Sequence, residues 1–243
     1  MTKKLYVRFS TAQDEQKIFD YYSDNQHEYV AKREPEIWKE RIASGAVTLI
    51  EDEQGKIVAS TITYPIVVMN EKGEDTHKWT EIGSVRVTLD GAGLFKPLLS
   101  AAVLRSFLLE PPEDRYAVEI VIGNAHSKHV FTKEGATEWK IPEELRLMVE
   151  DSISPDDTTG AVDWFQMGVE TIPGLARNIT HREANPVVVN SKTGEKFEID
   201  FSKCLLTTVF RDELDKVAGL DLGDTKAPNM SHGIKSCRDK FTP

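Results

Sequence analysis

Short runs along the chain of 243 residues alternate apolar with polar positions, and a period of two predicts β-strands. Other stretches space their apolar residues three and four positions apart, which predicts amphipathic helices. From residue 5 to residue 140 these signals give the order strand, helix, helix, three strands, helix, strand, helix. The predicted strands span 5–9, 46–50, 56–64, 79–87 and 116–122, and the predicted helices span 11–23, 35–44, 94–109 and 127–134.

Turn-forming residues separate these elements. The segment Asp52–Gly55 predicts a tight antiparallel hairpin, and the polar run Asn70–Lys78 predicts a loop. The strand at 116–122 is almost continuously apolar, which is typical of a strand that is covered on both faces. The order of these elements therefore predicts an α/β fold.

The pattern weakens after Trp139. The predictions there are a strand at 144–149, a linker at 152–159, a short helix within 162–175, a second hairpin formed by 187–189 and 196–201, and a helix at 206–217. We therefore divide the chain into a first domain, residues 1–150, and a C-terminal α+β extension, residues 151–243. Residues 221–243 are polar and aperiodic, and we expect them to pack on the first domain or on another subunit.

Composition narrows the possible functions. Hydrophobic residues make up 40% of the chain and charged residues 29%, as in ordinary globular proteins. The formal net charge of −10 disfavours nucleic-acid binding, which needs a basic surface. We find no stretch with the apolar length of a signal peptide or a membrane span, so we expect a cytoplasmic protein. Cys204 and Cys237 do not have metal-site spacing, and no metal is expected.

The stretch from Glu81 to Ala136 carries the candidate chemistry. It reads as a strand, a glycine-containing turn, a helix, a strand and a helix. A glycine turn between a strand and a helix leaves backbone N–H groups free, and the positive end of the helix dipole adds to them. The turn at Asp90–Phe95 is therefore a candidate phosphate site, although a plain strand-to-helix turn would use glycines for its geometry in the same way.

In its order and spacing this stretch resembles the core of the GNAT acyltransferase superfamily, and the resemblance covers residues 5–140. The resemblance implies a GNAT-like α/β fold with a mixed central sheet that is flanked by helices. That family holds the pyrophosphate of acetyl-CoA in a loop of the form (Gln or Arg)-x-x-Gly-x-(Gly or Ala). Gly93 matches the first glycine, whereas Phe95 replaces the second small residue and Asp90 replaces the Arg or Gln. The resemblance implies acetyl-CoA as the cofactor. The cofactor-binding residues that it implies are Val85, Val87, Gly91, Ala92, Gly93, Leu94, Phe95 and Asn124.

The resemblance also implies catalytic residues. Glu81, at the head of the strand, resembles the general base that accepts the proton of the attacking amine. Phe131 stands where the family often has a Tyr that protonates the leaving thiolate, and Phe has no proton to give. His126 is a second catalytic candidate, because imidazole suits acid–base work, although His126 and His129 also fit a plain surface pair. Asn124 fits a helix cap as well as a pantetheine contact.

The leading hypothesis is therefore an acyltransferase that moves an acetyl or other acyl group from acyl-CoA to an amine on a small molecule or a protein. The alternative is a non-catalytic protein on the same frame, because the segment Gly123–Ala136 also resembles small virion proteins of tailed phages. That alternative implies a structural or host-interaction role, a place in the virion and assembly through residues 151–243. A third reading is a transferase that modifies nucleobases or host proteins.

Overall fold

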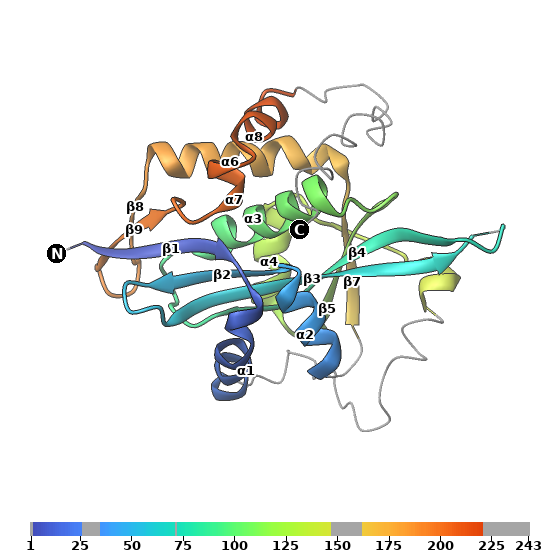
Figure 1. The fold of residues 1–243 in the computed structure, drawn as a ribbon, viewed down its shortest axis with the longest axis horizontal. Helices are drawn as coiled ribbons and strands as arrows, with labels where there is room; N and C mark the ends of the chain where they lie inside the picture. The colour runs from blue at the N-terminus through green and yellow to red at the C-terminus, as the bar shows by residue number, and fades with distance from the viewer. Residues whose placement is uncertain (1, 26–34, 71, 147–161, 221–243) are drawn as a thin grey trace.

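A computed structural model describes residues 2–25, 35–70, 72–146 and 162–220 of the chain (Figure 1). In this part the backbone forms a nine-stranded mixed sheet with helices on both faces. The strands are β1 (Lys3–Phe9), β2 (Val47–Asp52), β3 (Ile57–Met69), β4 (Asp75–Val87), β5 (Arg115–Val121), β6 (Thr137–Glu138), β7 (Val162–Met167), β8 (Val187–Val189) and β9 (Lys196–Asp200). The predicted α/β fold class is confirmed.

The helices lie between these strands in the chain. They are α1 (Glu15–Asp24), α2 (Pro35–Ala43), α3 (Phe95–Leu109), α4 (Ala125–Lys133), α6 (Ile172–Ala184), α7 (Leu205–Thr208) and α8 (Arg211–Ala218), with 3₁₀ turns at Ala12–Asp14 and Val169–Thr171. The order over residues 5–140 is the predicted one. It agrees with the GNAT-like sheet that the resemblance implied.

The order of the strands across the sheet is β6-β7-β5-β4-β3-β2-β1-β9-β8. Neighbours pair antiparallel, except that β4 runs parallel to β5 and β1 runs parallel to β9. Strands from both sides of residue 150 thus join one sheet: β7 pairs with β5, and β9 pairs with β1. The placement of a domain boundary at residue 150 stays a prediction.

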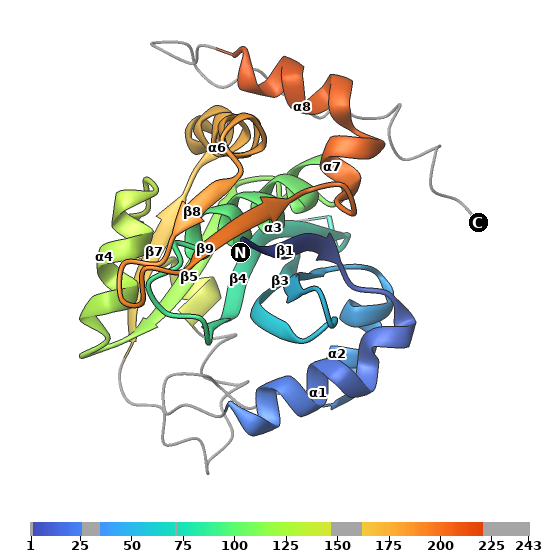
Figure 2. The same cartoon turned by 90° about the vertical axis from the view of Figure 1, so that its left-hand side faces the viewer.

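Helices α3, α6, α7 and α8 cover one face of the sheet, and α1 and α2 cover the other (Figures 1 and 2). The larger core lies on the α3 side, where Leu5, Val7 and Phe9 point from β1 toward α3. A second core lies on the α1 side and includes Ile18 and Trp38. Helix α3 is buried on almost all sides, because α6 lies on the side away from the sheet. This explains why the sequence of α3 is apolar around most of its circumference.

Several predictions for the less regular stretches are wrong. The predicted loop 70–78 is shorter, because β4 begins at Asp75 and continues the β3–β4 hairpin beyond the body of the sheet. Residues 144–146 are helical instead of extended, and this turn buries Leu145 beside Trp79. Residues 162–167 form β7 instead of the predicted helix, because Phe165 and Met167 alternate inward along the edge of β5. The end of that predicted range, 172–175, is helical and begins α6.

The remaining predictions concern the chain after residue 150. The hairpin of 187–189 and 196–201 is confirmed as β8 and β9. The predicted helix at 206–217 is broken into α7 and α8, with Val209 and Phe210 between them. The linker 152–159 and the tail 221–243 lie outside the described residues.

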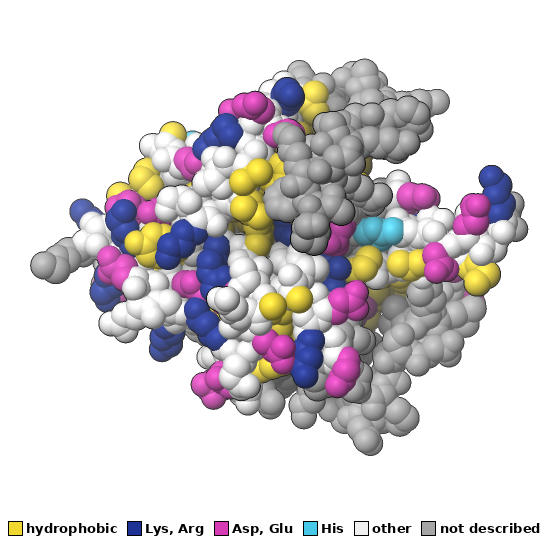
Figure 3. Space-filling view, viewed as in Figure 1, with side chains coloured by type: hydrophobic (Ala, Val, Ile, Leu, Met, Phe, Trp, Pro, Cys, Tyr) yellow, Lys and Arg dark blue, Asp and Glu magenta, His cyan; other side chains and the backbone are white. Residues whose placement is uncertain are grey.

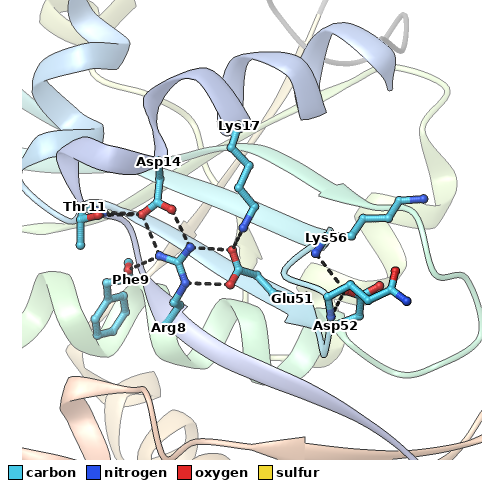
Figure 4. A network of polar contacts seen from close by, with 9 residues as sticks. Arg8, Phe9, Thr11, Asp14, Lys17, Glu51, Asp52 and Lys56 are labelled. Atoms are coloured by element: carbon cyan, nitrogen blue, oxygen red, sulfur yellow. Dashed lines mark hydrogen bonds and ion pairs between the residues drawn. The ribbon is translucent and has the colours of Figure 1, made fainter.

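Charged side chains of both signs are interspersed over the face seen in Figure 1 (Figure 3). One ion network is mostly buried and ties β1 to β2 and to the start of α1 (Figure 4). The Arg8 guanidinium lies between the Asp14 and Glu51 carboxylates, with Nη2 at 2.6 Å from an oxygen of each, and Lys17 also pairs with Glu51. None of the described helices has the length and apolar character to span a bilayer.

Candidate functional site

The parallel strands β4 and β5 separate partway along their length. They pair only from Trp79 with Arg115 to Glu81 with Ala117. Beyond Glu81, the β5-facing edge of β4 has no strand partner among the described residues. An open strand edge of this kind presents backbone N–H and C=O groups to whatever enters between the strands.

A β-bulge shapes this open edge of β4. Opposite β3, Ile62 pairs with Gly83 and Ser60 pairs with Arg86, so β4 carries one residue more than β3 over this span. Ser84 adopts a positive φ of 48°, which is strained for a residue with a side chain. The Tyr22 hydroxyl donates to the Ser84 carbonyl at 2.6 Å and holds the bulge from the α1 side. Bulges commonly redirect a strand beside a functional site.

A cavity of about 790 Å³ lies where the two strands separate. Its walls come from the end of β4, the end of β5, the loop before α3, the first turns of α4 and the turn between β8 and β9. The predicted site residues among its lining are Glu81, Val85, Val87, Gly91, Gly93, Leu94, Phe95, Asn124 and His126. Ala92 is the one predicted site residue that does not line it; its methyl group is buried in the core beneath the loop.

The loop before α3 is open at its centre. Gly91 and Gly93 have φ values of 80° and 65°, a region that favours glycine. Apart from Gly93 itself and its two chain neighbours, no atom of the described residues lies within 4 Å of the place where a side chain at Gly93 would start. Within the described residues, the N–H groups of Gly93, Leu94 and Phe95 donate no hydrogen bond, and Leu94 caps α3 without a side-chain bond. These donors at the positive end of α3 are suited to an anion.

The Phe95 ring lies on one wall of the cavity and does not fill it. It packs edge-on against Phe131, with ring centroids 5.0 Å apart. Phe131 is only 3% exposed and belongs to the core under α4. The bulky residue in the loop therefore turns toward α4 and leaves the space between β4 and β5 open.

Two acidic side chains, Glu81 and Glu119, line the cavity on the face of the sheet that α1 and α2 cover. Glu81 is the last residue of the paired stretch and is 7% exposed, with its carboxylate next to Gly83 and the Tyr64 ring. Ile82, Val118 and Ile120 point to the α3 side, so the alternation of each strand places both carboxylates on the opposite face. A cationic amine would approach from this side toward favourable charge.

Asn124 and His126 lie where β5 passes into α4. The Asn124 side chain accepts a hydrogen bond from the Ser127 N–H at 3.1 Å, so this residue is the N-cap of α4 while it also lines the cavity. His126 lines the cavity, and both His126 and His129 are exposed. In the described part, no three His, Cys, Asp or Glu side chains cluster to hold a metal ion.

The sequence interpretation missed several polar cavity residues besides Glu119, including Arg86, Ser191 and Lys192. Arg86 follows the bulge, and its buried Nε has no hydrogen-bond partner in the described structure. Ser191 and Lys192 come from the β8–β9 turn, about a hundred positions further along the chain. The local sequence pattern could have indicated Arg86, because it is a charge in an apolar strand. No local signal in the sequence indicates that the β8–β9 turn lies beside this loop.

The structure is similar to several solved acetyltransferases. N-acetylglutamate synthase from Neisseria gonorrhoeae, complexed with coenzyme A and N-acetyl-glutamate, shares 12% identity over 68% of this chain, with a TM-score of 0.47; the match spans only 35% of that protein. Rv2747 from Mycobacterium tuberculosis, in complex with CoA, shares 14% identity over 67% of this chain and 98% of its own, with a TM-score of 0.46.

A mutant of spermidine N-acetyltransferase SpeG from Vibrio cholerae shares 15% identity over 68% of this chain and 93% of its own, with a TM-score of 0.45. No family model and no curated protein matches the sequence.

Proposed function

We propose that this protein binds acyl-CoA between β4 and β5 and transfers the acyl group to an amine. The observation that carries the proposal is the parting of the two strands after Glu81, which leaves the backbone edge of β4 facing a cavity of about 790 Å³. The amide-containing pantetheine arm of a CoA ester suits an unpaired strand edge, because it can add hydrogen bonds as an extra strand would.

The residues present fit the two chemical ends of such a ligand. The N–H groups of Gly93, Leu94 and Phe95 donate to no other described group and would face its phosphates. Val85 and Val87 line the cavity, and their backbone groups would hold the pantetheine arm. When bound, acyl-CoA supplies an activated thioester, so the protein needs mainly to position the amine and remove its proton.

Glu81 is the proposed general base. Its carboxylate lies at the point where the strands separate, on the face that α1 and α2 cover. There it would attract the ammonium form of an acceptor and accept the proton that must leave before the nitrogen lone pair can attack. Glu119 on the same face adds negative charge that favours a cationic acceptor.

His126 is the proposed acid on the other wall. Phe131 is buried against Phe95 and carries no proton, so the departing thiolate needs a different donor. His126 is exposed at the cavity, and an imidazolium there would be able to protonate the thiolate and recover its own proton from solvent. Asn124 would orient this wall as the cap of α4.

Calorimetric titration with CoA and acetyl-CoA tests the cofactor part of the proposal. Binding supports it, whereas the absence of heat at about millimolar ligand would leave the non-catalytic scaffold as the better reading. The catalytic part is tested by thiol release from acetyl-CoA in the presence of a set of primary amines. Glu81→Gln should lower turnover about 10²-fold or more with little change in CoA affinity.

The matched control is Glu53→Gln, the same chemical change at an exposed position in the β2–β3 hairpin. Glu53→Gln should behave as the parent protein does. If Glu81→Gln retains the parent turnover, Glu81 has no part in the mechanism.

A further inference from the structure

The turn between β8 and β9 is built onto the glycine loop that precedes α3. Asn190 is 2% exposed, and its side-chain amide donates to the Asp90 carbonyl at 2.9 Å. The Ser191 N–H donates to the Gly91 carbonyl, also at 2.9 Å. The turn therefore engages loop carbonyls, which would repel an anion, and leaves the loop N–H groups available.

The same turn also has little freedom to move away. The Asn190 side-chain oxygen accepts from the N–H groups of Lys192 and Thr193 at 2.8 and 3.1 Å, which closes the turn around a buried side chain. Gly91 lies so close to it that a Cβ there would come within 2.8 Å of the Asn190 oxygen. This contact requires glycine at position 91 independently of any ligand. The C-terminal hairpin is thus a fixed part of the cavity wall.

Lys192 brings a positive charge to this end of the cavity. Its Nζ lies 3.2 Å from the Asp90 carboxylate, and both side chains line the cavity. The two side chains are 65% and 70% exposed, so their ion pair contributes little stability and can exchange partners at low cost. Lys96, the lysine that follows the glycine loop in sequence, pairs with Glu134 instead, with its Nζ 3.6 Å from that carboxylate.

The charge of the loop itself is unfavourable for an anionic ligand. Asp90 places a carboxylate at the loop, and the loop contains no Arg or Lys before Lys96. A phosphate would meet net repulsion there unless a cation offsets Asp90. Of the described lysines and arginines that line the cavity, Arg86 comes from the strand before the loop, and Lys192 comes from the turn in contact with the loop.

We propose that Lys192 is a phosphate-binding residue of the acyl-CoA site, supplied by the C-terminal hairpin in place of the cation that the glycine loop lacks. Its ammonium exchanges the Asp90 carboxylate for a phosphate oxygen of the nucleotide end of the ligand, and the Ser191 hydroxyl lies beside it, 3.3 Å from the Gly91 carbonyl. This proposal rests on the proposed function and adds a role for residues 190–195 in cofactor binding.

The test is calorimetry on the full chain with CoA and with pantetheine, which has no phosphate. Lys192→Gln should weaken CoA affinity about tenfold, which corresponds to about 1.4 kcal/mol, and leave pantetheine affinity unchanged. Lys192→Arg should retain most of the affinity because it keeps the charge. Lys196→Gln, an exposed lysine in the same hairpin that does not line the cavity, is the matched control and should not change it.

Asp90→Asn should change CoA affinity in the opposite direction to Lys192→Gln. It removes the repulsion and frees Lys192, so CoA affinity should rise several-fold at low salt. Equal CoA affinity of the parent and Lys192→Gln, with the parent binding CoA, would overturn the role of Lys192 alone. Absence of CoA binding by the parent protein would overturn the proposed function and this proposal together. Unchanged melting temperatures for the exposed substitutions would show that any loss of affinity is local.

Discussion

Asp14 offers a quantitative test of how the N-terminal strand is held in place. Its carboxylate accepts hydrogen bonds from Nη1 and Nη2 of Arg8 at 2.8 and 2.6 Å and from the N–H of Thr11 at 2.8 Å. Burial acts to raise the pKa of this carboxyl, but the hydrogen bonds from Arg8 and Thr11 outweigh burial and hold the pKa at about 2, below the ordinary 3.8. Asp14→Asn removes the charge while an amide of the same shape remains.

The pKa difference sets the size of the effect. At about 1.36 kcal/mol per pKa unit, a decrease from 3.8 to about 2 corresponds to at most about 2.4 kcal/mol of stability at neutral pH. Arg8 keeps its bonds to Glu51 in the variant, and solvent reaches part of the cluster. We therefore expect a loss of about 1–2 kcal/mol, or about 3–6 °C in melting temperature.

The pH dependence distinguishes charge from packing. Because the folded-state pKa is lowered, the stabilisation is fully present above pH 3.8 and is lost as the pH falls through about 2. Urea unfolding at pH 7 and pH 3 should show the difference between parent and Asp14→Asn shrinking to roughly half. Asp20→Asn, the same change at an exposed position of α1, is the control and should cost little. A loss for Asp14→Asn that is equal at both pH values would refute this reasoning.

Two further predictions concern the core on the α3 side. Burial raises the pKa of the Cys204 thiol to about 12. In a Cys237→Ser variant at pH 8, iodoacetamide should therefore label Cys204 only after the protein is unfolded in urea. Rapid labelling of the folded protein would contradict the burial of Cys204. Phe131→Ala should lower the free energy of unfolding in urea by about 3–4 kcal/mol, because the ring is 3% exposed and packs on Phe95. Phe95→Ala removes a half-buried ring and should lower it by less. Equal losses for the two variants would contradict the described packing of these rings at the cavity wall.

Much of the fold follows from local pattern in the sequence. The alternation in Leu5–Phe9, the hairpin around Asp52–Gly55 and the stop at Gly45, whose φ is 75°, each reappear in the structure. In each case the signal lies within a few residues, since side-chain periodicity and turn geometry are local properties. The candidate site was predictable for the same reason, because most of its residues lie in one continuous stretch from Glu81 to His126.

The errors fall where local pattern and environment diverge. The start of β4 is polar because both faces of the projecting hairpin are partly exposed to water, so alternation could not reveal it. Residues 162–167 mix aromatic and small side chains, and only pairing with β5 makes them a strand. The strand bulge at Ser84 likewise depends on its register with β3 and on the hydroxyl of Tyr22.

The sequence by itself determined the order of elements over residues 5–140, which side of each element is apolar, and the glycine loop with its acidic and aromatic neighbours. Tertiary structure alone decided that β4 and β5 separate after Glu81, that Phe95 turns toward Phe131, and that Lys192 meets Asp90 from about a hundred positions away. The physical reason is that periodicity specifies which side of an element is apolar, whereas the choice of neighbour depends on packing between segments that are distant in the chain.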